Sequence, residues 1–176
     1  MILQLAAAVG TGPTELAAFD DALLQVGAAN YNLVRLSSVI PPASHLTECD
    51  GAMSSPGGSW GDRLYVVYAE QRASRPGEQA WAGVGWAQDQ SGKGLFVEHE
   101  GSSERGVRDQ IDASLDHLQH GRSLRLGPSR RRLIGGTVVD RPICALVLCG
   151  YQTEAWDPDT TTARRVVVAD QELQSC

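Results

Sequence analysis

The chain has 176 residues, of which 42% are hydrophobic and 20% are charged, and its formal net charge is -6. This length suits one domain with its own core and is short for two, and the composition excludes a disordered or fibrous class. The negative charge argues against nucleic acid as a partner, because phosphate binding needs a basic excess.

The N-terminal segment 1–10 is apolar and lacks a basic start, so it predicts a first strand and not a signal peptide. No stretch reaches the roughly 18 apolar residues that a membrane span requires. We therefore expect a cytoplasmic protein with no membrane partner. The cysteines form no CxxC pair and no histidines stand at metal-ligand spacing, so we expect neither a metal site nor a disulfide framework.

Segment 11–27 predicts an amphipathic helix, with Pro13 suited to its first turn and Gly27 to its end. Its apolar residues recur at steps of three and four: Leu16, Phe19, Leu23 and Val26. The segment 31–36 then alternates apolar and polar residues, which favours a strand. That strand ends at Ser37 and Ser38, just before a double proline.

The middle of the chain predicts a Gly/Ser-rich loop followed by a β-meander. Residues 47–61 are rich in Gly, Ser and Pro, and we expect a mobile surface loop there. Segments 63–74, 81–86 and 95–100 have strand character and are separated by the turns RPGE and DQSGKG.

A second helix is expected over 101–121, and strand character returns over 135–156. The basic run at 130–132 is interpreted as a solvated turn. The polar segment 157–176 leaves both disorder and late packing open. We expect one α+β domain over 1–156, a sandwich of mostly antiparallel β-sheet flanked by helices, followed by a C-terminal tail.

The adjacent hydroxyls of Ser37 and Ser38 have a simple structural explanation, since serines at a strand end cap turns. Their context indicates more. The tract NYNLVRLSSVIPP over 30–42, which follows the helix motif FDDALL, resembles the pyruvoyl-dependent arginine decarboxylases. The motifs GLFVEHEG and GGTVVDRPICALVLCGY continue the resemblance in the same order, so that it covers about residues 1–156.

The resemblance implies a pyruvoyl-dependent decarboxylase-like fold and self-cleavage between Ser37 and Ser38. In that family the second serine attacks the preceding carbonyl, and the residue that remains becomes a pyruvoyl group. Here Ser38 would be the pyruvoyl precursor. Asn32 matches the family asparagine and is the candidate for assisting processing and holding the oxyanion.

The family also implies a substrate and an assembly. Arginine would condense through its amine with the pyruvoyl ketone, lose carbon dioxide and leave as agmatine, a polyamine precursor. Glu98 matches the glutamate that donates the final proton. Asp20 matches the aspartate that binds the guanidinium, with Leu16 one helical turn earlier on the same face. Family members are trimers, so we expect a homotrimer or a dimer of trimers.

Departures from the family pattern leave other functions open. His99 replaces an aromatic residue next to Glu98, and an imidazole there is expected to change the titration of that carboxyl. The loop 47–61 and the segment after Trp156 are also unusual. One alternative is the same chemistry on another amino acid or an arginine-like metabolite. Another is an uncleaved, non-catalytic trimeric homologue.

Overall fold

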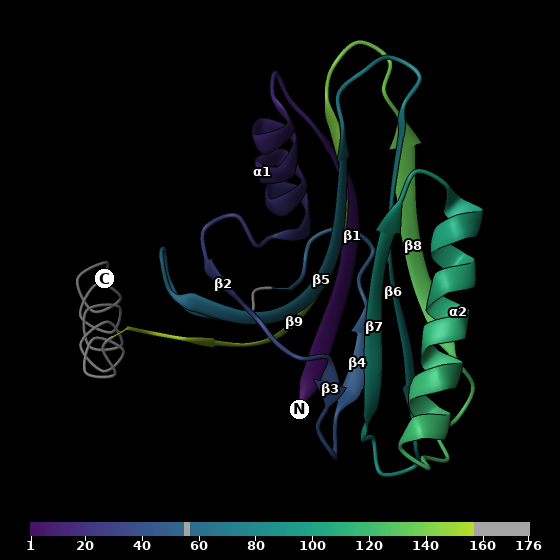
Figure 1. Cartoon of the computed structure of the whole chain (residues 1–176). Helices are drawn as coiled ribbons and strands as arrows, with labels where there is room; N and C mark the ends of the chain where they lie inside the picture. Colours follow the sequence, from purple (N-terminus) through teal and green to yellow (C-terminus); the bar gives the residue numbers. More distant parts are fainter. Residues whose placement is uncertain (55–56, 157–176) are drawn as a thin grey trace, which may run out of the picture.

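A computed structural model describes residues 1–54 and 57–156 of the chain (Figure 1). The tail predicted at 157–176 lies outside the described residues. Within the described part the elements, in chain order, are β1 (Ile2–Thr11), α1 (Glu15–Val26), β2 (Asn32–Arg35), β3 (Val39–Ile40), β4 (His45–Glu48), β5 (Arg63–Ala73), β6 (Gln79–Gln88), β7 (Gly94–Gly101), α2 (Glu104–Gly121), β8 (Arg130–Thr137) and β9 (Ile143–Glu154).

The described strands form two sheets. One has the order β2-β5-β9-β1-β4, and the other has the order β3-β7-β6-β8 and is antiparallel throughout. The first sheet is mixed, because β4 runs parallel to β1 and β2 runs parallel to β5. The expected α+β sandwich is thus confirmed, with two parallel pairs added to the antiparallel pattern.

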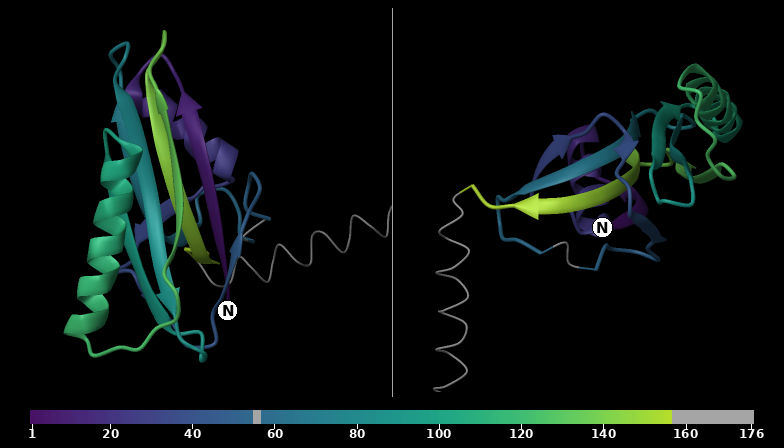
Figure 2. Two further views of the ribbon diagram at one scale, coloured as in Figure 1. Left: turned by 90° about the vertical axis from the view of Figure 1, so that its right-hand side faces the viewer. Right: turned by 90° about the horizontal axis from the view of Figure 1, so that it is seen from below.

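The elements lie in four layers, in the order α1, five-stranded sheet, four-stranded sheet and α2 (Figures 1 and 2). Apolar residues from both sheets fill the space between them and form the main core, which includes Leu5, Val67, Val84 and Phe96. A second core lies between α1 and the five-stranded sheet, and a third lies beneath α2. Each sheet therefore buries one face against its partner and the other against a helix.

Local sequence explains why both helices begin where they do. The side chain of Thr14 accepts a hydrogen bond from the backbone of Ala17, and Ser103 caps α2 in the same way. Helix α1 also lies unusually close to β1: a Cβ at Gly10 would stand 2.2 Å from the carbonyl oxygen of Ala18. Glycine and alanine at this contact allow the helix to pack flat on the sheet.

Two sequence interpretations fail at this level. Residues 130–132 do not form a solvated turn, because they lie in β8 and pair with β6. The expected loop over 47–61 is only partly a loop, because β4 continues to Glu48 and Met53 is 4% exposed. No helix among the described residues is long and apolar enough to cross a membrane.

Candidate active site

A serine hydroxyl and a largely buried carboxylate meet at one edge of the sandwich. Ser38 lies in the connection between β2 and β3, and Glu98 lies on β7. The Oγ atom of Ser38 lies 2.8 Å from Oε1 and 2.7 Å from Oε2 of Glu98. The hydroxyl therefore donates to the carboxylate, and a nucleophile stands beside a group that can take its proton.

The backbone of Ser38 is strained. Its φ angle is 66°, in the left-handed region that a residue with a Cβ adopts at a cost of about 1–3 kcal/mol. Hydrogen bonds on both sides hold this conformation: the Leu36 N–H donates to the Val66 carbonyl at 2.8 Å, and the Phe96 N–H donates to the Ser38 carbonyl at 2.9 Å. Strain of this kind persists only where the surrounding structure fixes it.

The position of Glu98 on β7 follows from strand alternation. Phe96, two residues earlier, belongs to the core between the sheets, and Glu98 points to the same side. Across β6 its partner is Val84, which is completely buried. The carboxylate therefore lies at the border of an apolar core, with the Ser38 hydroxyl as its hydrogen-bond partner.

Burial raises the pKa of the Glu98 carboxyl above its ordinary value. The hydrogen bond from Ser38 and the positive charge of Arg35 lower the pKa, and the negative charge of Glu100 raises it, but burial is the largest effect. The net result is a carboxyl group that takes up a proton more readily than an exposed glutamate. Such a group suits acid–base chemistry.

Arg35 and Tyr151 belong to the surroundings of this pair and were not singled out from the sequence. The Arg35 guanidinium lies 4.9 Å from the ring centroid of Tyr68 and donates to the Tyr68 carbonyl at 3.1 Å. The Tyr151 hydroxyl donates to the carbonyl of Val39 at 3.2 Å. Strand patterning gave no sign of either contact, since the first depends on the pairing of β2 with β5 and the second on the stacking of the two sheets.

Asn32 lies at the start of β2, away from the Ser38 end of that segment. Its side-chain amide donates to the Gly61 carbonyl at 2.6 Å, and its backbone N–H donates to the Asp62 carbonyl at 2.8 Å. No hydrogen bond joins Asn32 to Ser37 or Ser38 in the described chain. Within one chain, Asn32 therefore fixes the turn that leads into β5.

The predicted substrate-binding residues lie on α1, on the outer face of the five-stranded sheet. Asp20 is exposed, and Leu16 is 67% exposed. No described hydrogen bond or ion pair connects Asp20 to Ser38 or Glu98. One chain brings Ser37, Ser38 and Glu98 together and leaves Leu16 and Asp20 on a separate surface.

His99 does not share the surroundings of Glu98, although the two residues are adjacent. Its Nε2 atom lies 2.8 Å from the Ser114 hydroxyl of α2, on the opposite face of β7. Burial lowers the pKa of His99 below its ordinary value. The charges that act on the Glu98 carboxyl come from Arg35 and Glu100, which removes the basis for the expected effect of His99 on Glu98.

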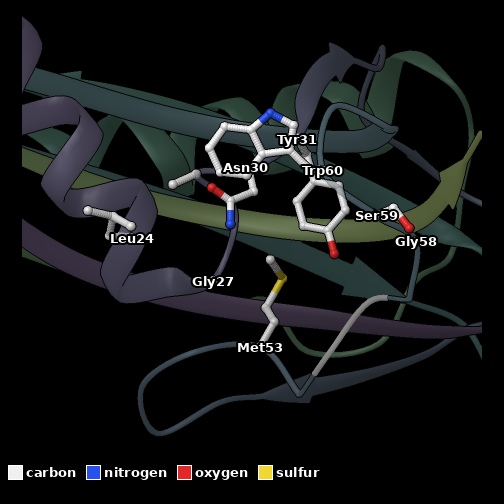
Figure 3. A pocket seen from close by; sticks show the side chains of 9 residues that line it. Leu24, Gly27, Asn30, Tyr31, Met53, Gly58, Ser59 and Trp60 are labelled. Carbon is white, nitrogen blue, oxygen red and sulfur yellow. The ribbon is translucent and has the colours of Figure 1, made fainter. Parts of the chain in front are cut away.

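A hollow of about 370 Å³ lies between the end of α1 and the segment around Trp60 (Figure 3). Figure 3 shows the side chains of Tyr31, Trp60, Leu24 and Met53, which all line the hollow. Neither Ser38 nor Glu98 lines this space. The hollow continues the exposed surface of α1 rather than the serine–glutamate site.

Comparison with known proteins agrees with the resemblance seen in the motifs. Residues 3–131 match the family model described as "Pyruvoyl-dependent arginine decarboxylase". A Halobacterium salinarum protein with the same name is 42% identical over 96 residues, which cover 54% of this chain and 58% of that protein. The Thermococcus kodakarensis protein of that name is 34% identical over 151 residues, covering 82% of this chain and 90% of its own length. For the Pyrococcus abyssi protein, identity is 40% over 113 residues.

Proposed function

Because the chain belongs to the pyruvoyl-dependent arginine decarboxylase family, we propose that it cleaves itself between Ser37 and Ser38 and then converts L-arginine to agmatine and carbon dioxide. The observation that carries this proposal is the hydrogen bond from the strained Ser38 to the largely buried Glu98 carboxylate. A residue that only capped a turn would not need a largely buried carboxylate partner of raised pKa.

Cleavage begins when Glu98 accepts the hydroxyl proton and Ser38 Oγ attacks the carbonyl carbon of Ser37. The amide bond between the two serines breaks and an ester takes its place. Loss of the Ser38 α-proton then breaks the ester C–O bond and releases the Ser37 carboxylate. The dehydroalanine that remains takes up water, releases ammonia and becomes a pyruvoyl group.

The residues around Ser38 fit a pyruvoyl group formed at that position. The carbonyl of Ser38 survives cleavage, and the Phe96 N–H that holds it would hold the same atom afterwards. The pyruvoyl ketone supplies an electron sink for decarboxylation, as pyridoxal phosphate does in other enzymes. Glu98, protonated more readily because of its burial, would return a proton to the substrate carbon that loses carbon dioxide.

Arginine recognition would come from Asp20 and Leu16 of a neighbouring protomer. A carboxylate can take two parallel hydrogen bonds from a guanidinium, and Leu16 would pack on the aliphatic part of the substrate. Within one chain both residues lie apart from Ser38, so the proposed site requires a second copy. We therefore propose a homotrimer or a dimer of trimers.

Exposed apolar residues next to Asp20 support this assembly. Leu16 and Leu24 lie four residues before and after Asp20 on α1 and are 67% and 57% exposed. Trp60, at the hollow beyond Leu24, is 82% exposed. Large apolar side chains that gather on one surface are typical of interfaces.

Asn32 would contribute to processing by fixing β2 through its hydrogen bond to the Gly61 carbonyl.

Release of labelled carbon dioxide tests the substrate. The purified protein would be incubated with carboxyl-labelled arginine, ornithine, lysine and histidine, next to a Ser38→Ala variant. We expect release from arginine alone and none from the variant. Release from another amino acid in preference to arginine would keep the chemistry and overturn the substrate.

A further inference from the structure

Tyr151 is the one residue of β9 that has no partner in the register between β5 and β9. Tyr65 pairs with Gln152 and Val66 pairs with Gly150, so Tyr151 is the extra residue of a β-bulge. Bulges bend a strand and redirect a side chain, and they are frequent next to active sites. Here the redirected side chain points between the two sheets and is 9% exposed.

The hydroxyl of Tyr151 reaches the chain that follows the cleavage site. It donates to the Val39 carbonyl at 3.2 Å. Strand β3 is an edge strand, paired with β7 alone in the four-stranded sheet. The bond from Tyr151 therefore gives β3 a second attachment, and this attachment comes from the opposite sheet.

Phe96 and Tyr151 hold two successive carbonyls. The Phe96 N–H binds the Ser38 carbonyl and the Tyr151 hydroxyl binds the Val39 carbonyl. Their rings also pack edge to face, with centroids 6.2 Å apart. The peptide unit after Ser38 is thereby held from the four-stranded sheet and the next one, after Val39, from the five-stranded sheet, which keeps Ser38 in its strained conformation with its hydroxyl on Glu98.

From these contacts we infer that Tyr151 is a positioning residue for self-cleavage and for the pyruvoyl group that cleavage creates. This inference rests on the proposed function. Without the hydroxyl, the backbone of β3 is held only by its pairing with β7, and Ser38 can relax toward the favourable region of negative φ. Relaxation would move the Ser38 hydroxyl away from the Glu98 carboxylate and slow its attack on Ser37.

The test is the rate of precursor cleavage in a Tyr151→Phe variant, followed by intact mass after rapid purification. The phenylalanine keeps the ring contact with Phe96 and removes only the hydroxyl. We expect cleavage to slow roughly 3- to 10-fold, the effect of losing one neutral hydrogen bond. In fully cleaved protein we expect kcat for arginine to fall by a similar factor with little change in KM.

Tyr65→Phe is the matched control. Tyr65 packs against the same core, and its hydroxyl donates to the Glu154 carboxylate at the end of β9 instead of to the chain that follows Ser38. We expect this variant to cleave at the wild-type rate and both variants to unfold at similar temperatures. Wild-type cleavage in Tyr151→Phe, or an equal loss in Tyr65→Phe, would overturn the inference. An uncleaved wild-type protein would instead overturn the proposed function.

Discussion

Ser38 and Glu98 stand 60 positions apart in the chain, and the hydroxyl of the first donates to the carboxylate of the second. Each residue carries a cost there: Ser38 has a left-handed backbone, and Glu98 is held in surroundings that disfavour its charge. Two such costs at one contact mark a functional pair more strongly than either alone.

A Glu98→Gln substitution tests the role of this carboxylate in cleavage. Glutamine keeps the shape of the side chain and still accepts a hydrogen bond from Ser38, but it takes up no proton at neutral pH. We expect the precursor to cleave about 100-fold more slowly or worse, as is typical for loss of an acid–base group. The half-time of conversion from one chain to two, followed on a denaturing gel at pH 7, measures this.

Glu100→Gln is the control for that experiment. Glu100 lies two residues further along β7 and is exposed, and it acts on Glu98 only through its charge. Cleavage in this variant should stay close to the wild-type rate. Equal cleavage rates in Glu98→Gln and wild type would contradict a catalytic role for Glu98.

The pH dependence of cleavage should show the raised pKa of Glu98. Attack by Ser38 needs the carboxylate form, so cleavage slows as falling pH protonates Glu98. Because burial raises this pKa above the ordinary value of 4.5, the loss should begin at a higher pH than for an exposed glutamate. Precursor half-times measured across a pH series would show this fall in the cleavage rate. A wild-type cleavage rate that falls with its midpoint at or below pH 4.5 would contradict the prediction.

The sequence predicted the parts of this site that depend on residues near one another in the chain, and it did not predict those that depend on residues far apart in the chain. The sequence singled out Ser37, Ser38 and Glu98 because each stands in a short motif, and it predicted α1 from an apolar period. The neighbours of the site were not found, because the contact of Tyr151 with Val39 needs a bulge and the stacking of two sheets. The strand at 130–132 was missed for a related reason: pairing with β6 overrides a run of charges.

An Asp20→Asn substitution tests guanidinium recognition. Loss of a charge-assisted pair costs about 1.5–3 kcal/mol, so we expect KM for arginine to rise about 10- to 150-fold while cleavage is unchanged. Steady-state carbon dioxide release over a range of arginine concentrations gives KM and kcat separately.

Asp21→Asn provides the comparison for Asp20. The Asp21 carboxylate accepts the Thr11 N–H at 2.8 Å and the Gln25 amide at 3.0 Å, both of which lie within its own chain. This variant should lose thermal stability and keep its KM. If Asp20→Asn binds arginine as wild type does, the proposed recognition by α1 is wrong.

Mixed oligomers test whether Asp20 serves a neighbouring protomer. The Ser38→Ala and Asp20→Asn chains would each have little activity alone. Coexpressed and purified together through different tags, they should regain a measurable fraction of wild-type activity, because some sites combine an intact Ser38 with an intact Asp20. No recovery in verified mixed oligomers would show that each site is built from one chain.

The most direct test of the account is the intact mass of the purified protein under denaturing conditions, with and without borohydride. The account predicts two chains, one ending at Ser37 and a larger one that begins with a pyruvoyl group in place of Ser38, resists N-terminal sequencing and gains two hydrogens on reduction. A single full-length chain that persists on long incubation would contradict it and favour an uncleaved, non-catalytic homologue.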